Sequence, residues 1–175
     1  MPSWNSRGLR GSTLEELINL SNSKYEEKGL ALVRKIPTPI TPININHSNK
    51  QITLAYFDQK STVDYIGVVQ GIPVCFDAKE SATDTFALQN VHEHQVKFME
   101  SWVKQDGIAF LIIFYKAKNK YYYMPFSELK KFWDRALQGG RKSIRYEELD
   151  EGFEILSTEG VPVHYLDALK SYLER

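Results

Sequence analysis

The segment 62–79 constrains the fold of this chain more than any other. Two runs rich in valine, isoleucine and aromatic residues, 62–69 and 72–79, flank Gln70 and Gly71, a pair typical of a two-residue hairpin turn. Opposed residue numbers in such a hairpin sum to 141, and both of its faces are then mostly apolar. We therefore expect these strands to lie at the centre of a sheet that helices cover on both faces.

Two aspartates interrupt this apolar hairpin. Its register places Asp64 opposite Asp77 and Thr62 opposite Lys79, with all four side chains at one end of one face. Carboxylates about 5 Å apart in cross-strand positions repel each other, so something must compensate their charge. A shared proton, the Lys79 ammonium or a divalent cation would each do so, and an all-oxygen set favours Mg²⁺ or Mn²⁺ over zinc. The alternative is a pair of ordinary strand-end aspartates that lysines neutralise, and the spacing alone does not decide between the two.

The rest of the chain predicts an α/β fold. The stretch 37–50 contains three prolines, so we expect an exposed excursion there rather than a regular core element, leading into a short strand at 51–57. Ser12 and Ser127 are the expected N-caps of two helices. Apolar periodicity and length predict helices at 12–28, 91–105, 127–137 and 165–173, and further strands at 30–36, 108–114, 120–124 and 153–156. This order implies a mixed central sheet flanked by helices.

Three further groups of polar residues are candidates for function, each with a structural alternative. Glu15 lies three residues after Ser12, as in a capping box. Gln95 belongs to the inward stripe of the helix at 91–105, where a buried amide needs partners, either in the core or as a ligand. The glycine-led loop GGRKSIR suits contact with phosphates, or is a solvated basic loop; its basic residues are Arg141, Lys142 and Arg145.

The formal charge of the 175-residue chain is zero, which by itself argues against a simple polyanion-binding protein. The charge is unevenly distributed, however, with +3 over 1–60, −4 over 61–100, +7 over 101–145 and −6 over 146–175. No apolar run is long enough for a membrane span, and residues 1–11 lack the apolar stretch of a signal peptide. The single cysteine, Cys75, forms no intrachain disulfide, so we expect a reducing cytoplasm and no membrane partner.

Seven sequence blocks stand out between residues 5 and 149: NSRGLRGSTLEELIN, RKIPTP, AYFDQKSTVDYIGV, FDAKES, FALQNVHEHQ, QDGIAFLII and FWDRALQGGRKSIRYEEL. In their order and spacing they resemble RecU, the Holliday junction resolvase family of low-GC Gram-positive bacteria. The resemblance implies a restriction-endonuclease-like PD-(D/E)xK fold, with 1–175 as a single nuclease domain and 37–60 as a stalk. It also implies an Mg²⁺-dependent endonuclease, for which Mn²⁺ can substitute, that resolves four-way DNA junctions by paired symmetric nicks and leaves 5′-phosphate ends. Two symmetric cuts need two active sites, hence a homodimer.

The resemblance also assigns residues. It implies metal ligands at Thr62, Asp64, Asp77 and Gln95, a catalytic lysine at Lys79 and a further acidic residue on the first helix at Glu15. Glu15, Asp64, Asp77 and Lys79 are therefore the predicted catalytic residues. The basic residues expected to contact DNA are Arg7, Arg10, Lys50, Lys60, Arg141, Lys142 and Arg145.

The chain departs from the family pattern in three ways. Asp77 replaces a glutamate that is common in RecU, the usual long basic tail is missing, and the stalk region after Thr41 carries only Lys50 and Lys60 as basic residues. These departures suit a compact variant of phage or prophage origin, acting in the host cytoplasm near the nucleoid. Recombinases and branch-migration proteins are the candidate protein partners. Two alternatives stay open: a non-catalytic junction-binding modulator of recombination, and a restriction-type nuclease that cuts duplex DNA.

Overall fold

The computed structural model describes residues 13–57, 62–158 and 160–175, and four α-helices lie within them. The helices are α1 (Leu14–Glu27), α2 (Glu93–Val103), α3 (Phe126–Leu137) and α4 (Tyr165–Leu173). The main sheet contains β1 (Ala31–Lys35), β4 (Tyr65–Val69), β5 (Ile72–Ser81), β7 (Ile108–Tyr115), β8 (Lys120–Pro125) and β10 (Glu154–Ile155). Two smaller sheets pair β2 (Ile40–Asn46) with β3 (Gln51–Phe57), and β6 (Thr85–Ala87) with β9 (Ser143–Arg145). Short 3₁₀ turns cover Leu88–Asn90, Lys116–Lys118, Tyr146–Glu148 and Glu151–Phe153.

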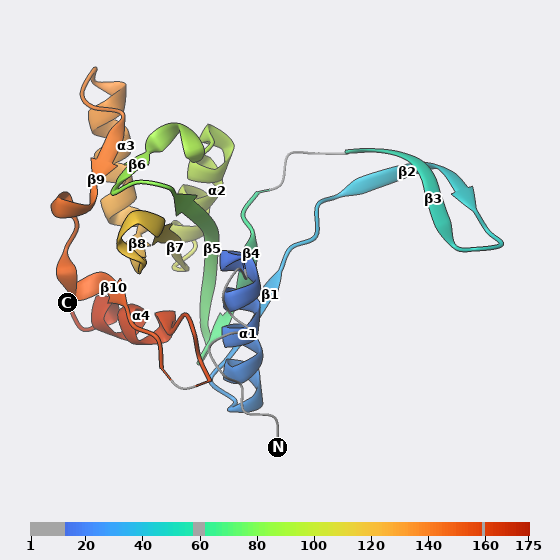
Figure 1. Cartoon of the computed structure of the whole chain (residues 1–175), viewed down its shortest axis with the longest axis horizontal. Coiled ribbons are helices and arrows are strands. Elements are labelled where there is room, and N and C mark those ends of the chain that lie inside the picture. Colours follow the sequence, from blue (N-terminus) through green and yellow to red (C-terminus); the bar gives the residue numbers. More distant parts are fainter. Residues whose placement is uncertain (1–12, 58–61, 159) are drawn as a thin grey trace.

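The main sheet is mixed, as predicted. Its strand order is β1-β4-β5-β7-β8-β10, in which β5 and β7 run parallel and every other neighbouring pair is antiparallel. Helix α1 packs on β1 and β5, and α4 on β8 and β10, whereas α2 and α3 pack on β7. Helices thus flank the sheet on both sides (Figure 1). The expected mixed α/β architecture is confirmed, and the hairpin strands β4 and β5 are interior strands of the sheet.

The hairpin has the predicted register. Tyr65 pairs with Phe76 and Val69 with Ile72, so opposed numbers sum to 141 along the whole ladder. Gln70 and Gly71 both have positive φ, +48° and +87°, as a type I′ turn requires. The paired strand β4 begins at Tyr65, later than expected, because the residues before it pair through side chains, as described below.

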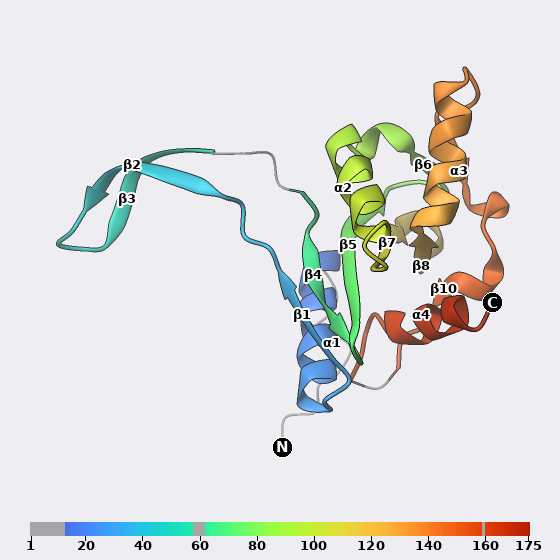
Figure 2. The ribbon, with the colours of Figure 1, turned by 180° about the vertical axis from the view of Figure 1, so that it is seen from behind.

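A two-stranded hairpin, β2–β3, projects far from the body of the molecule (Figures 1 and 2). We call this hairpin the stalk. The predicted exposed excursion over 37–50 is confirmed, since nearly all of β2 is exposed. The sequence did not predict that β2 is a strand that pairs with β3 over most of its length. Prolines are tolerated in it because both strands lie at an edge, and the register shifts next to Pro42.

Two predicted helix starts are wrong. Helix α1 begins at Leu14, and its capping box is formed by Thr13 and Glu16: the Glu16 N–H donates to Thr13 Oγ1 at 3.3 Å, and the Thr13 N–H donates to Glu16 Oε2 at 2.8 Å. The expected cap Ser12 lies outside the described residues, and Glu15 takes no part in the cap. Helix α3 begins at Phe126, so Ser127 is inside the helix rather than capping it.

Four aromatic side chains cross the middle of the sheet. Tyr65, Phe76, Phe110 and Tyr123 come from β4, β5, β7 and β8, and their successive ring centroids are 4.7, 4.6 and 4.4 Å apart. All four are fully buried, and Tyr165 of α4 packs against Phe76 and Phe110. This stack fixes the strands that carry the hairpin aspartates. Within the described part of the chain, none of the helices has the length and apolar character needed to cross a membrane.

Candidate active site

Asp64 and Asp77 meet at the open end of the β4–β5 hairpin. The Asp64 backbone N–H donates to Asp77 Oδ1 at 3.0 Å, and the Ala78 backbone N–H donates to Asp64 Oδ2, also at 3.0 Å. Each carboxylate therefore accepts a hydrogen bond from the backbone of the opposite strand, and these bonds continue the strand ladder past Tyr65. The two side chains are thereby fixed relative to each other.

The pair is electrostatically strained. Asp77 is completely buried, and burial together with the negative charge of Asp77 raises the pKa of Asp64 to about 6. Lys79 Nζ lies 2.5 Å from Asp77 Oδ2, and this ammonium is the compensating charge that the structure contains. Asp77 Oδ2 accepts no well-aligned hydrogen bond, although it is buried. A buried carboxylate oxygen held only by a cation is suited to accept another cation in its place.

The donor set fits a hard divalent cation. Two carboxylates at one point supply the charge that Mg²⁺ requires, and the set contains no sulfur or imidazole ligand that would favour zinc. Elsewhere in the described chain, as here, no three His, Cys, Asp or Glu side chains form a metal-binding group. Any ligands of the cation other than the two aspartates would therefore be neutral oxygens or water.

Thr62 and Gln95 are the neutral oxygen ligands that the sequence predicts. Thr62 is half-buried, two residues before Asp64. Gln95 is 6% exposed on α2, a helix that packs against β5 and β7. Its Oε1 accepts the His92 N–H at 3.1 Å, so the amide closes the first turn of α2 and keeps one lone pair free. Within the described residues, no hydrogen bond joins Thr62 or Gln95 to either aspartate, so their role as ligands stays a prediction.

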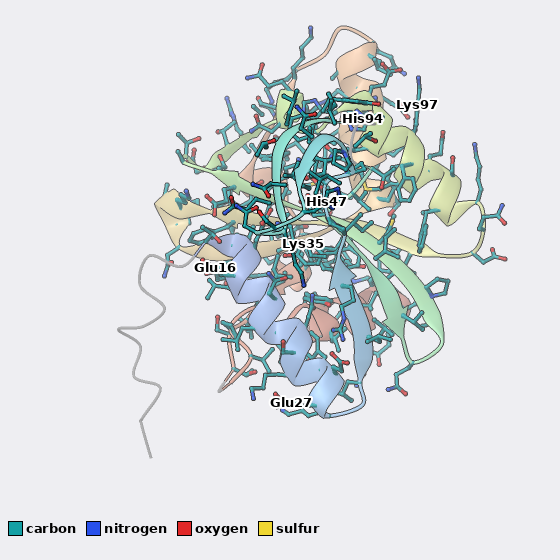
Figure 3. The ribbon with its side chains drawn as sticks, turned by 90° about the vertical axis from the view of Figure 1, so that its right-hand side faces the viewer. Glu16, Glu27, Lys35, His47, His94 and Lys97 are labelled. Carbon is teal, nitrogen blue, oxygen red and sulfur yellow. The ribbon has the colours of Figure 1, made fainter. Side chains whose placement is uncertain are left out.

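Glu15 lies on α1, away from direct contact with the aspartates. Its carboxylate forms an ion pair with Lys35 of β1, and its backbone carbonyl accepts the Tyr65 hydroxyl at 3.3 Å. Burial raises the pKa of Tyr65, and the negative charges of Glu15, Asp64 and Asp77 raise it further. Figure 3 views the molecule from the side on which the stalk projects and labels Lys35. Glu15 thus shares a neighbour, Tyr65, with the pair, and among the described residues no hydrogen bond or ion pair joins it to either aspartate.

Sequence reasoning missed three residues around the site: Lys35, Tyr65 and Glu80. Glu80 follows Lys79 on β5; its Oε1 accepts the Leu14 N–H at 3.2 Å, and its carboxylate pairs with Lys116. Because side chains alternate along β5, Glu80 lies on the face opposite Lys79. This alternation was the available signal that Glu80 contacts a helix, which is α1. No local pattern indicates that Lys35 pairs with Glu15, because this contact joins two separate elements.

The predicted DNA-binding residues fall into two groups far apart (Figure 1). Lys50 is exposed at the stalk tip, whereas Arg141 and Lys142 lie in the loop after α3 and Arg145 is the last residue of β9. Arg141 forms an ion pair with Glu148, but Lys142 and Arg145 have no ion-pair partner among the described residues. Arg7, Arg10 and Lys60 lie outside the described residues.

Comparison with known proteins gives a consistent result. The family model for recombination protein U, RecU, matches residues 9–171. A protein of Levilactobacillus brevis named Holliday junction resolvase RecU is 42% identical over 95% of this chain and 85% of its own length. Proteins of the same name from Staphylococcus saprophyticus and Bacillus licheniformis are 42% and 40% identical, over 81% and 89% of this chain and 70% and 78% of their own.

A solved structure of Hjc, a Holliday junction resolvase of Archaeoglobus fulgidus, aligns with a TM-score of 0.38 and 8% identity, over 64% of this chain and 74% of that chain. The family assignment depends on the sequence matches alone. Because the family model matches residues 9–171 and a relative that is 42% identical covers 95% of the chain, the chain belongs to the RecU family.

Proposed function

We propose that this protein is a metal-dependent endonuclease that resolves four-way DNA junctions by paired symmetric nicks. The observation that carries the proposal is the pair of Asp64 and Asp77, with the Lys79 ammonium 2.5 Å from the buried Asp77 Oδ2. Relatives at about 40% identity are named Holliday junction resolvases, which supports the same activity. The single nuclease domain, its restriction-endonuclease-like fold and its cytoplasmic location are parts of the proposal.

Asp64 and Asp77 would hold Mg²⁺, or Mn²⁺ in its place, with Thr62 and Gln95 as neutral ligands. The bound cation would polarise the scissile phosphate and lower the pKa of a water molecule. Lys79 would release Asp77 and turn its ammonium toward the phosphate, where a positive charge stabilises the developing negative charge. Glu15, held by Lys35, would supply a further negative charge at the edge of the site. In keeping with the resemblance to RecU, the bond to the 3′ oxygen would break, which leaves 5′-phosphate ends.

We further propose that the protein acts as a C2 homodimer that contacts the junction through its stalks. A lone two-stranded hairpin is marginally stable in water, yet the stalk exposes seven large apolar or aromatic side chains. They are Ile40, Ile43, Ile45, Ile52, Leu54, Tyr56 and Phe57, between 45% and 74% exposed. The stalk of a second copy, with the same apolar side chains, would cover them. Two active sites related by a two-fold axis match the two strands that must be cut.

The test is cleavage of a labelled four-way junction and of a linear duplex of the same sequence, each with Mg²⁺ or Mn²⁺. We expect paired nicks in the junction, and loss of cutting by about 100-fold or more in Asp77→Asn and Asp64→Asn, because each removes a ligand charge. Asp106→Asn is the matched control: Asp106 is exposed in a turn with φ +60°, a conformation that asparagine tolerates.

Each contrary result has a definite meaning. Undiminished cutting by Asp77→Asn would exclude this carboxylate pair as the active site. Tight junction binding without cutting, in either metal, would support a non-catalytic modulator of recombination. Equal cutting of the linear duplex would support a restriction-type nuclease.

A further inference from the structure

Glu148 is bonded to three groups of the basic segment 135–145, which comprises the end of α3, the loop 138–142 and β9, although it was not among the predicted site residues. Its Oε1 lies 2.9 Å from Arg135 Nη1, and its Oε2 accepts the Arg145 backbone N–H at 2.8 Å. Arg141 forms an ion pair with the same carboxylate. One acidic side chain therefore contacts the helix before the loop, the loop itself and the strand after it.

The two arginines converge on a second shared acceptor. Arg135 Nη2 donates to the Ser143 carbonyl at 2.7 Å, and Arg141 Nε donates to the same carbonyl at 3.3 Å. Gly140 lets the loop fold back this closely, because a Cβ there would come within 2.8 Å of the Arg135 carbonyl oxygen. Arg141 is thus occupied in shaping the loop, and its guanidinium is not simply directed at solvent.

The loop is joined to the strand that carries the active-site pair. After β5 the chain forms β6, which pairs with β9, and the Lys142 carbonyl accepts the Leu88 N–H at 3.1 Å. The Tyr146 N–H donates to the Asp84 carbonyl at 2.8 Å. The orientation of the loop relative to Asp77 and Lys79 is therefore set by backbone contacts on one side and by Glu148 on the other.

We propose that Glu148 is a positioning residue for DNA binding: it holds Arg135 and Arg141 so that Lys142 and Arg145 meet the phosphates of the junction. The inference rests on the proposed function. It predicts that removing a negative charge changes the DNA affinity in the unusual direction. Removing a negative charge near a DNA-binding surface ordinarily strengthens binding. Removing the negative charge of Glu148 should instead weaken binding. The loop then loses its fixed shape, and ordering its basic side chains on DNA costs more conformational entropy.

Glu147 provides a matched control, since it is the next residue, is exposed, and forms no hydrogen bond or ion pair within the described residues. We would compare Glu148→Gln with Glu147→Gln, which remove the same charge. Junction affinity is measured over a salt series in Ca²⁺. We expect Glu148→Gln to weaken binding roughly fivefold and Glu147→Gln to leave it unchanged or up to about twofold tighter. Lys142→Met should reduce the slope of log affinity against log salt concentration by about 1, the amount expected for the loss of one phosphate contact.

Limited trypsin digestion tests the positioning role without DNA. Glu148→Gln should be cut faster after Arg141 and Lys142 than the wild type, whereas Glu147→Gln should be cut at the wild-type rate. Tighter junction binding by both variants, or equal trypsin rates in all three proteins, would overturn the proposal. A wild type that binds no junction would instead overturn the proposed function, and the trypsin rates would still decide whether Glu148 holds the loop.

Discussion

At the scale of single residues, the Asp64 carboxyl has an unusually high pKa. An aspartate in an unfolded chain titrates near pH 3.9, whereas Asp64 in the folded protein titrates near 6. Between these values the native state binds more protons than the unfolded state, so the free energy of unfolding falls as pH rises through this window. In the metal-free protein, the contribution of Asp64 to the free energy of unfolding is therefore lowest at neutral and higher pH.

Asp64→Asn should accordingly stabilise the metal-free protein while it abolishes cutting. The amide oxygen can still accept the Ala78 N–H, and the repulsion from Asp77 disappears. In EDTA we expect a higher Tm than the wild type at about pH 8 and a smaller difference at about pH 4.5, where Asp64 is already protonated in the folded wild type. Added Mg²⁺ should raise the Tm of the wild type more than that of the variant. Equal Tm values at pH 8 would contradict the repulsion between the two aspartates.

The contacts of a residue could be predicted from the sequence where they are fixed by local spacing, and not where they join separate elements. The pairing of Asp64 with Asp77 followed from a two-residue turn, because register then fixes every opposed pair. Glu15 was misread as a capping residue, since two neighbouring candidates, Ser12 and Thr13, fit the same motif. The partnership of Arg141 with Glu148 joins residues on either side of a strand, and no local spacing encodes it.

At the scale of elements, the close contact of β1 with β4 depends on Gly67. Gly67 lies opposite Val33, and a Cβ on it would come within 2.2 Å of the Leu32 carbonyl oxygen and 2.6 Å of Val33 Cα. Both of these atoms belong to the backbone, so no side chain can move aside. Directly after β1, the Ile36 N–H donates to the Asp64 carbonyl at 2.8 Å.

Gly67→Ala should therefore separate β1 from β4. We expect a loss of at least about 2 kcal/mol in the free energy of unfolding, since the backbone must shift to relieve the overlap. Val68→Ala is the control from the same strand; Val68 is 46% exposed, so its truncation should cost less than about 1 kcal/mol. Urea denaturation measures both. Equal losses in the two variants would show that β1 can move away without penalty.

The elements that the sequence predicted best are those whose local pattern agrees with their burial. Helix α4 occupies 165–173 as predicted, and the hairpin β4–β5 has the predicted turn. For 37–50 the predicted exposed excursion is confirmed, but the strand β2 within it was not predicted, because prolines usually indicate irregular structure. The strand forms nonetheless because its hydrogen-bonding partner β3 is adjacent in sequence and because both strands are free at their outer edges.

At the scale of the whole molecule, the exposed apolar side chains of the stalk bear on assembly. Ile45 lies opposite Ile52 and is 47% exposed. Ile45→Asp should place a charge within the proposed contact of two stalks and lower the fraction of dimer in sedimentation equilibrium by about tenfold or more. Asn46→Asp adds the same charge one residue away at a polar position and should leave the dimer intact. A monomer in all three proteins would exclude the stalk-to-stalk dimer.

The uneven charge of the chain leads to a prediction about binding conditions. The −4 stretch contains Asp64 and Asp77, which a divalent cation would neutralise, and the +7 stretch contains the loop of Lys142. Junction binding should therefore weaken in EDTA and fall steeply with salt. Filter binding or fluorescence anisotropy between about 50 and 200 mM salt, with and without metal, measures this. Tight binding that is insensitive to both would contradict the proposed surface.

The central place of β5 has one more consequence. This strand bears Asp77 and Lys79, and it is hydrogen-bonded to β4 on one side and to β7 on the other. Its backbone amides should be among the slowest in the protein to exchange with deuterium, because they open only when the sheet unfolds as a whole. The aspartate pair is then lost only together with the fold, so a partly opened molecule keeps the geometry of its site, and an unfolded one has no site with which to cut DNA.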